Sequence, residues 1–337
     1  MHNRWHPDIP PTVTVLPGQA LTLACEDGMA GLLTRESVHS DCGHLDLGLP
    51  HPLAGPVHVV GAQPGDVLEV VFLGYESADF AVTAVIPGFG FLADVFTEPY
   101  LVKWEIEDGL ARSAELPGVA VPGDLFAGVV GVAPSPERLE AVLLREHGIA
   151  ERGGPVAESA PEAAAPVEAA AGLRTIPPRE IGGNLDIRQL VAGSRLFLPV
   201  DVPGALFSIG DLHFAQGDGE VCGTAIEVKG SVTVSFQLHR GGEHRHRFPA
   251  YETPARPGRR CFATTGIPVD DAMDLTVAAR EALTAMIDHL VATHGFEPVA
   301  AYALCSAVVD LRLSEVVDVP YPVVSALLPL DVFDASP

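Results

Sequence analysis

Short segments in which apolar and polar residues alternate occur along most of the chain. Alternation with a period of two is the pattern of a half-buried β-strand. The clearest apolar positions of this kind are Val13 and Val15; Leu21 and Leu23; Val57 and Val59; Leu68, Val70 and Phe72; Leu196, Leu198 and Val200; and Val232, Val234, Phe236 and Leu238. The 34 glycines and 30 prolines of the chain favour turns over long helices. The pattern therefore predicts an α/β fold that is mostly β.

Two segments repeat their apolar positions with helical spacing instead. One of them carries Leu283, Met286, Ile287, Leu290 and Val291 on a single face. Asp270 and Asp271 precede this segment and Gly295 can close it, as is common at helix ends. We expect this helix to pack its apolar stripe on a sheet. A second helix is predicted over about 136–144.

The stretch 150–171 differs in composition from the rest of the chain. It is rich in Ala, Glu, Pro and Gly, and its largest apolar side chains are valines. Such a segment has little apolar surface with which to anchor itself. We expect a mobile linker or insertion between a β-rich part, 1–149, and an α/β part, 172–337, which together form one catalytic domain.

A Pro-Gly pair precedes an apolar run at three places in the chain. Pro122–Phe126 resembles Pro203–Phe207, and Pro64–Leu68 is a weaker third copy. Duplication of a β unit would leave this trace, but Pro-Gly turns before strands are also common. Both interpretations stay open.

The chain is strongly acidic. It has 44 Asp and Glu against 20 Lys and Arg, a net charge of -24. This charge repels phosphate backbones and anionic lipids, so we expect neither a nucleic acid nor a membrane as partner. We find no run of about 18 apolar residues and no apolar signal segment, and therefore expect a cytoplasmic protein. Five scattered cysteines without a Cys-x-x-Cys pair argue against a disulfide framework.

A dense group of acidic residues with a histidine, and without lysine or arginine, lies between Gly210 and Glu220. Asp211 and His213 are two residues apart, so on a strand both side chains leave the same face. Asp218 and Glu220 repeat this spacing, and the glycines between the pairs allow a tight turn that brings them together. Carboxylates and an imidazole gather in this way around a shared cation or a reacting water. The pattern predicts a metal site, with an acidic surface hairpin as the alternative.

Two further polar groups are candidates for the same pocket. Asn184 and Asp186 share strand spacing after a pair of glycines, although an Asx turn explains them equally well. Glu26 and Asp27 follow the strand that ends at Cys25, where a carboxylate commonly faces either a site or water.

Other reactive residues have plainer explanations. The histidines within 39–58 lack the same-face spacing of metal ligands, and the polarity of a loop is enough to explain them. Cys222 lies near Glu220 and Lys229, as in a cysteine-dependent amidase, but a buried structural thiol is the favoured interpretation. The glycine pattern 217–223 does not fit the dinucleotide-binding fingerprint, because its last glycine comes one residue late.

Several segments taken together resemble the acetamidase/formamidase family. They are Gly182–Ile187, Leu198–Val200, Gly204–Asp211, His213, Gln216–Glu220 and Gly223–Glu227, and the likeness extends to Gly55–Val57, Gly61–Leu68, Gly128–Pro134, Ala303–Ser306 and Asp310–Arg312. The motifs occur in order and at the right spacing over nearly the whole chain. The resemblance implies a strand-rich fold, a homo-oligomer of two or more subunits and a divalent metal.

The resemblance also implies hydrolysis of the C–N bond of a short aliphatic amide, which releases ammonia and a carboxylic acid. Because the family's acidic residue after the first strand pair falls on Asp27, we expect Asp27, Asp211 and His213 to hold the metal. Zinc is favoured and calcium is the alternative. A metal at this place would activate water and polarise the carbonyl.

An amide also needs an acid that protonates the leaving nitrogen. We expect Glu220 or Asp218 to move this proton, and we expect Gln216 and Asn184 to complete the catalytic group.

Leu212, Phe214 and Asp186 are the expected substrate contacts. Leu212 and Phe214 are bulkier than the residues that the family places beside the histidine, so they would bear on the choice of substrate. Two alternatives stay open at this point: a metal- or small-molecule-binding protein without turnover on the same scaffold, and a hydrolase of a larger amide.

Overall fold

The computed structural model describes residues 1–241, 246–254, 260–296, 298, 301, 309–330 and 333. Its strands are β1 (Arg4–Trp5), β2 (Val13–Val15), β3 (Leu21–Cys25), β4 (Leu53–Val59), β5 (Val67–Val85), β6 (Tyr100–Glu107), β7 (Leu110–Arg112), β8 (Val121–Pro122), β9 (Phe126–Gly131), β10 (Leu173–Arg174), β11 (Gly182–Asn184), β12 (Arg195–Pro199), β13 (Phe207–His213), β14 (Glu227–His239), β15 (Ala250–Glu252), β16 (Cys261–Gly266), β17 (Asp310–Glu315) and β18 (Val323–Pro329). Its α-helices are α1 (Pro136–Glu151) and α2 (Leu275–His294), and short 3-10 turns cover His39–Gly43, Pro161–Ala163 and Val167–Ala169.

Most of the described strands join one large sheet. Its main path is β11-β9-β13-β14-β5-β12-β15-β16-β18-β17, with the remaining strands branching from it and β1 paired separately with β10. The pairs are antiparallel except for β2 with β4. The predicted mostly β fold with a few packing helices is confirmed. Each of the segments with a period of two contributes to a strand, and Val200 lies just beyond β12.

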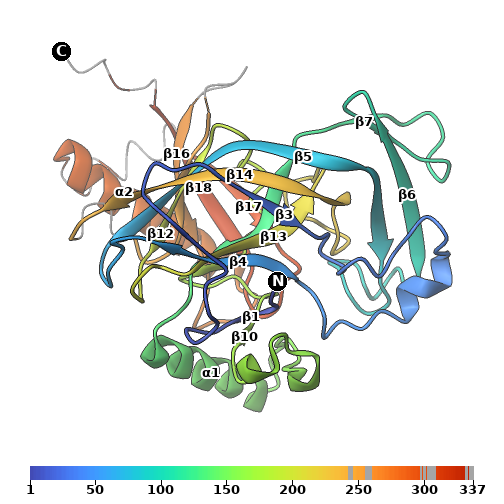
Figure 1. Cartoon of the computed structure of the whole chain (residues 1–337), viewed down its shortest axis with the longest axis horizontal. Coiled ribbons are helices and arrows are strands. Elements are labelled where there is room, and N and C mark those ends of the chain that lie inside the picture. The colour runs from blue at the N-terminus through green and yellow to red at the C-terminus, as the bar shows by residue number, and fades with distance from the viewer. Residues whose placement is uncertain are drawn as a thin grey trace.

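The core is built around the long strands β5 and β14. They pair antiparallel over most of their length, with Val234 opposite Phe72 and Phe236 opposite Val70. Figure 1 shows these strands side by side across the top of the molecule, with the β6–β7 hairpin extending away from them. The apolar side chains of the alternating pattern are buried here, because every second residue of a strand faces the same layer.

Helix α2 confirms the helix that was predicted around Leu283–Val291. Asp274 caps its start by accepting hydrogen bonds from the backbone N–H groups of Thr276 and Val277, and Gly295 ends it with a φ of 68°. Its stripe, which includes Met286 and Leu290, packs on a face that includes residues of β16 and β18. None of the described helices is long and apolar enough to cross a membrane.

Helix α1 confirms the second predicted helix and extends it to Glu151. The Ser135 hydroxyl accepts a hydrogen bond from the Arg138 backbone N–H at its start, which is the usual role of an N-terminal serine. In Figure 1 the helix lies below the sheet, next to β1 and β10.

The stretch 150–171 packs against the start of the chain. The Asn3 amide donates to the carbonyl of Ala163 and accepts from the N–H of Ala165, and the Arg4 guanidinium donates to the carbonyl of Ser159. Strand β9, before this stretch, pairs with β11 and β13, after it. The two sides therefore share one sheet. The division of the chain at 150–171 and the mobility of this stretch stay predictions.

The close contact between Gly266 of β16 and the backbone of α2 can be tested by mutation. A Cβ atom at Gly266 would lie 1.9 Å from the carbonyl oxygen of Ala278 in α2, so Gly266→Ala must push the helix away from β16. We expect a loss of about 1–3 kcal/mol in the free energy of unfolding, as is typical of overpacking, measured by urea denaturation. Gly74→Ala in β5 is the control, because nothing lies within 4 Å of the added methyl group. Equal stabilities of the two variants would contradict this account.

Candidate active site

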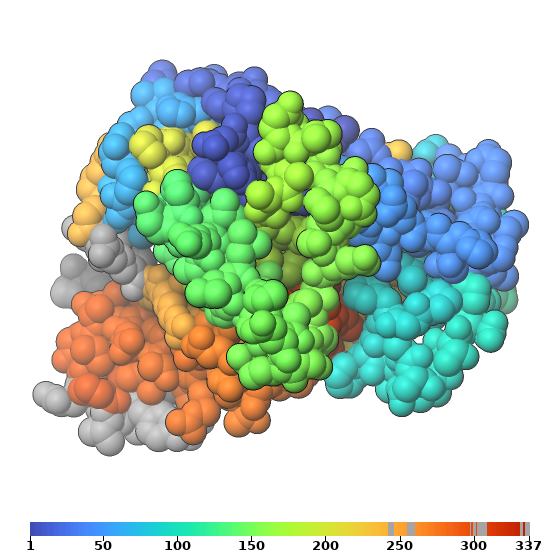
Figure 2. Space-filling model, turned by 90° about the horizontal axis from the view of Figure 1, so that it is seen from below, coloured from blue at the N-terminus to red at the C-terminus, as the bar shows by residue number. Residues whose placement is uncertain are grey.

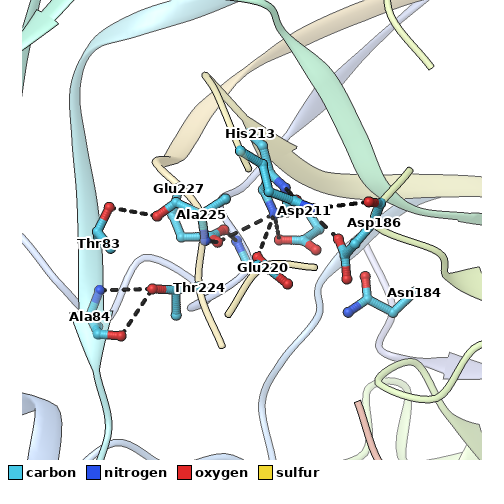
Figure 3. Close-up of polar contacts among 12 residues, drawn as sticks. Thr83, Ala84, Asn184, Asp186, Asp211, His213, Glu220, Thr224, Ala225 and Glu227 are labelled. Carbon is cyan, nitrogen blue, oxygen red and sulfur yellow. Dashed lines mark hydrogen bonds and ion pairs between the residues drawn. The ribbon is translucent and has the colours of Figure 1, made fainter. Parts of the chain in front are cut away.

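Five buried ionisable side chains meet where the sheet strands β13 and β14 adjoin two loops. His213 and Asp211 come from β13, and Glu227 begins β14. Glu220 lies in the connection between them, and Asp186 follows β11. Figure 3 shows the four carboxylates arranged around His213. Each of the five residues is at most 6% exposed, so their charges are not screened by bulk water.

A short chain of hydrogen bonds sets the orientation of the His213 ring. The Gln216 side-chain NH₂ donates to the backbone carbonyl of Asp186 at 2.9 Å, which leaves the Gln216 oxygen facing His213 Nδ1 at 2.8 Å. An oxygen of this kind only accepts, so Nδ1 carries the proton. In the neutral imidazole Nε2 therefore presents a lone pair.

The Nε2 atom of His213 points into the carboxylates. It lies 3.3 Å from Asp211 Oδ1, 3.3 Å from Glu227 Oε1 and 3.8 Å from Glu220 Oε1. On the other side of the ring, Nδ1 lies 3.8 Å from Asp186 Oδ1. The Nε2 atom therefore has three carboxylate oxygens as close neighbours, and those of Asp211 and Glu227 lie near enough to each other to share a metal ion with it.

The backbone is strained at three of these carboxylates. Asp186, Asp211 and Glu220 have φ values of 45°, 58° and 45°, in the left-handed region that residues with a Cβ seldom adopt. Such conformations cluster at functional sites, where the surrounding structure holds them in place. The left-handed turn at Asp211 also breaks the regular alternation of β13.

Gly128 in β9 makes room for the cluster. A Cβ atom there would lie 2.3 Å from Asp186 Oδ1 and 2.6 Å from Asp211 Oδ2. The strand next to β13 must therefore carry a glycine at this position, so that the carboxylates can lie against its backbone.

Glu227 is held by two backbone donors. Its Oε1 accepts from the N–H of Ala225 at 2.8 Å and its Oε2 accepts from the N–H of Gly28 at 3.3 Å. The chain before Glu227 is fastened to β5, because Thr224 Oγ1 accepts from the N–H of Ala84 and donates to its carbonyl (Figure 3). These bonds fix the carboxylate opposite His213.

Burial and mutual repulsion raise the pKa of most of these carboxyl groups. Burial raises the pKa values of Asp186 and Glu220 well above their usual range. Neighbouring carboxylates, including Asp318, raise both pKa values further. Burial likewise raises the pKa of Glu227 to about 7, although His213 opposes the shift. Negative charge at this place is thus costly without a cation.

Asp211 and His213 form the charged centre of the cluster. Burial favours the neutral form of Asp211, but the charges of His213 and His51 outweigh it and hold the pKa below its usual range. Burial disfavours a charged His213, but Glu227 and Asp211 raise the pKa of the ring well above its usual value. The site therefore attracts positive charge strongly.

The donor set fits a metal ion. Among the described residues, two overlapping groups could hold one: Asp186, His213 and Glu220, and Asp211, His213 and Glu227. Several of the buried polar atoms here have no hydrogen-bond partner, namely His213 Nε2 and both carboxylate oxygens of Asp186. Buried polar atoms without partners are rare and call for a ligand. A cation would satisfy them.

The structure brings together most of the residues that the sequence predicted for the site. Asp211, His213 and Glu220 belong to the cluster, and Gln216 and Asp186 contact it through the hydrogen bonds described above. Asn184 stands at its edge, where its side-chain NH₂ donates to Asp318 and its oxygen has no partner. The turn between the two acidic pairs does bring Glu220 to the histidine.

Two predicted residues lie apart from the His213 ring. Asp218 accepts a hydrogen bond from Gln189 and pairs with Arg312 at 3.0 Å. Asp27 is buried, but its Oδ1 accepts from the N–H of Gly31, and it belongs to neither metal-binding group found in the described chain. Its turn nevertheless covers the site, because a Cβ at Gly28 would lie 2.1 Å from Asp211 Oδ1.

Three residues that matter to the site were not assigned to it from the sequence. In the sequence, Glu227 is only the last residue of the family-like segment Gly223–Glu227, and Asp318 lies in a distant segment without a local signal. His51 was explained by loop polarity, which is wrong: it is 7% exposed and lines the cavity beside Asp211. The Cys222 thiol donates to the Thr224 carbonyl and burial raises its pKa, as expected of a structural thiol.

A small cavity of about 50 Å³ adjoins the carboxylates. Its polar wall consists of His51, Asn184, Asp211, Glu220, Glu227 and Asp318, and its apolar wall consists of Met29, Leu47, Pro50, Ile86, Phe89 and Ile176. Figure 2 shows the face of the molecule on which blue, green and blue-green segments converge, with part of the red C-terminal region between them. The cavity is lined by residues from the blue, blue-green and red regions, together with Ile176, Asn184, Asp211, Glu220, Gly223 and Glu227.

A larger cavity of about 670 Å³ lies on the other side of Glu220, and Gln216, Asp218 and Cys222 also line it. Neither Leu212 nor Phe214 is among the described residues that line these two cavities. Both of these side chains are buried in the main core, so their role as substrate contacts stays a prediction that no contact supports.

Comparison with known proteins places the chain in a family. The model of the Acetamidase/Formamidase family matches residues 1–335. The chain is 33% identical to a formamidase from Methylophilus methylotrophus over 99% of this chain and 89% of that protein, and 35% identical to an acetamidase from Mycolicibacterium smegmatis over 86% and 81%. It also superposes on the structure of a gamma lactamase from Delftia acidovorans with a TM-score of 0.73 and 35% identity, over 99% of this chain and 90% of that chain. The resemblance found in the sequence is thereby confirmed, and the chain belongs to the Acetamidase/Formamidase family.

Proposed function

We propose that this protein hydrolyses the C–N bond of a short aliphatic amide to ammonia and a carboxylic acid, with a divalent cation at His213. One observation carries the proposal: Nε2 of His213 faces three buried carboxylates beside a small cavity that is lined by both polar and apolar side chains. An amide combines the same two characters, a polar carbonyl with its nitrogen and an apolar alkyl group. The formamidase and acetamidase relatives support this activity.

The volume of the cavity favours a small substrate over a larger amide. At about 50 Å³ it is larger than the roughly 10–15 Å³ that a single water needs, but it is small beside common ligand sites of roughly 300–1,000 Å³. Formamide and acetamide, among the smallest amides, suit a cavity of this size.

Asp211, His213 and Glu227 are the residues that would hold the cation, with Glu227 in the place predicted for Asp27. A bound divalent cation supplies Lewis acidity, which makes the amide carbonyl more electrophilic and makes a neighbouring water more acidic. Zinc is favoured over calcium because calcium prefers six to eight oxygen ligands and an imidazole nitrogen suits zinc. Gln216 keeps the lone pair of Nε2 directed at this position.

Glu220 is the group that we assign to proton transfer. It lines both cavities, and its Oε1 lies 3.8 Å from His213 Nε2. It would accept a proton from the attacking water and deliver it to the leaving nitrogen, which departs as ammonia. Asp218 is less suited to this role, because its ion pair with Arg312 holds it in the outer cavity.

The assembly and the compartment are inferred from the sequence and the family resemblance. We infer a homo-oligomer of at least two subunits in the cytoplasm. Light scattering after size-exclusion chromatography measures the number of subunits directly.

The first test removes the central ligand. His213→Ala should lose both the bound metal and more than about 100-fold of the ammonia release, since loss of a residue that merely orients a ligand already costs 10- to 100-fold. Elemental analysis and an ammonia assay with formamide and acetamide measure the two effects. His147→Ala, on the exposed face of α1, is the matched control and should change neither. Full turnover by a metal-free H213A enzyme would refute the proposal.

The second test concerns the hydrogen bond that orients the ring. Gln216→Leu frees Nδ1 and should weaken metal affinity by about 10- to 100-fold, with ammonia release restored by excess zinc. Gln189→Leu removes a similar amide that contacts only Asp218 among the acidic residues of this region and should leave metal affinity unchanged. If added zinc fails to restore turnover in Q216L while the protein stays folded, Gln216 does not act through the metal ligand.

The third test removes the metal from the unaltered protein. Dialysis against a chelator should abolish ammonia release, and zinc should restore it more completely than calcium, for the reason given above. The metal content of each sample is measured beside its activity. Undiminished turnover after complete metal removal would eliminate the role of the cation, and recovery with calcium alone would replace zinc by calcium.

A further inference from the structure

We infer that Phe89, seated on Gly223, sets the length of the acyl chain that the cavity accepts. The inference rests on the proposed function, because it assigns the apolar wall of the same cavity to the alkyl part of the amide. Substrate choice then depends on the β5–β6 connection and the turn after Glu220. The sequence had instead indicated Leu212 and Phe214 as the substrate contacts.

Phe89 lies directly against the backbone of Gly223. A Cβ atom at position 223 would lie 2.4 Å from Phe89 Cε1, so any side chain there would displace the ring. Gly223 has a φ of 91°, a conformation that also disfavours other residues. The ring of Phe89 therefore occupies the space that a side chain at position 223 would need.

The segment of Phe89 is fastened to the segment of Glu220. The N–H of Phe91 donates to the carbonyl of Val221 at 3.0 Å, and the N–H of Gly223 donates to the carbonyl of Glu220 at 2.8 Å. The backbone of Gly90 also approaches Cys222 so closely that a Cβ there would lie 2.8 Å from its carbonyl oxygen. The apolar wall thus has a defined position relative to the catalytic carboxyl group.

The polar wall determines which end of the substrate meets Phe89. The carbonyl and the nitrogen of an amide belong next to Glu220, Asp211 and Glu227 of this wall, where charge develops during the reaction. The alkyl group must then point to the apolar wall, on which Phe89 and Ile176 are half-buried.

Phe89 can change without opening the core. Met29 and Ile86 are buried members of a small core cluster, and Phe89 packs on its edge. Truncating Phe89 therefore adds volume to the cavity at its apolar side. A methylene group that fits or fails to fit an apolar pocket changes the specificity constant by about 10- to 200-fold.

The test compares amides of increasing acyl length. We expect the unaltered protein to favour formamide and acetamide and to lose kcat/KM steeply towards butyramide. Phe89→Ala should raise the ratio of kcat/KM for butyramide over acetamide by about 10-fold or more, and Phe89→Trp should lower it. Phe91→Ala is the matched control, because this neighbouring ring is 56% exposed and does not line the cavity; its ratio should stay within about twofold of the original.

The outcomes separate this inference from the proposed function. If the unaltered protein releases no ammonia from any amide of the series, the proposed function fails and the inference fails with it. If it hydrolyses the short amides but the ratio in F89A is unchanged, only the inference is overturned. Should F89A lose all turnover, Ile176→Ala decides, because this residue widens the same wall from another segment: a raised butyramide ratio supports an acyl pocket here, and an unchanged ratio overturns it.

Discussion

The hydrogen bond between Gln216 and His213 is the interaction on which the site depends. It fixes the imidazole so that one nitrogen faces three carboxylates in a place from which bulk water is excluded. Negative charges packed so closely repel one another and pay a large desolvation penalty. Positive charge at the centre, from a protonated ring or a bound cation, therefore stabilises the arrangement. This explains why the proposed metal ligands and the carboxyl groups with perturbed pKa values are the same residues.

The sheet makes this crowding possible by holding backbone close to backbone. Gly128 lets β9 pass beneath Asp186 and Asp211, and Gly28 lets the turn after β3 close over Asp211 and Glu227. The left-handed conformations at three acidic residues turn their side chains towards a common centre. Strain of this kind persists where many surrounding contacts oppose relaxation, and at Asp211 the pairing of β13 with β9 and β4 provides them. The extensive sheet is thus the mechanical support for a small reactive cluster.

Local patterns predicted much of the fold and part of the site. Alternation of apolar residues located β5, β12 and β14, and the spacing of apolar residues around Leu283 located α2, because burial of one face imposes these periods on any strand or helix. Asp211, His213 and Glu220 were found for a related reason: they lie within eleven residues, so a single turn unites them. Asn184 and Asp186 were candidates because their spacing after two glycines is unusual. Sequence reasoning succeeded where the partners are neighbours in the chain.

Residues that reach the cavity from distant segments of the chain could not be predicted from local sequence patterns. Nothing near His51 or Asp318 marks it as part of a site, since each reaches the cavity only because the sheet brings its segment there. Phe89 faces the cavity because it rests on Gly223, a contact between two loops that no periodicity encodes. By itself the sequence determined the strand-rich class, the family and the acidic motif with its histidine. The tertiary structure alone decided which carboxylates face Nε2 and which side chains line the cavity beside them, because long-range packing, not local spacing, sets the distances between segments far apart in the chain.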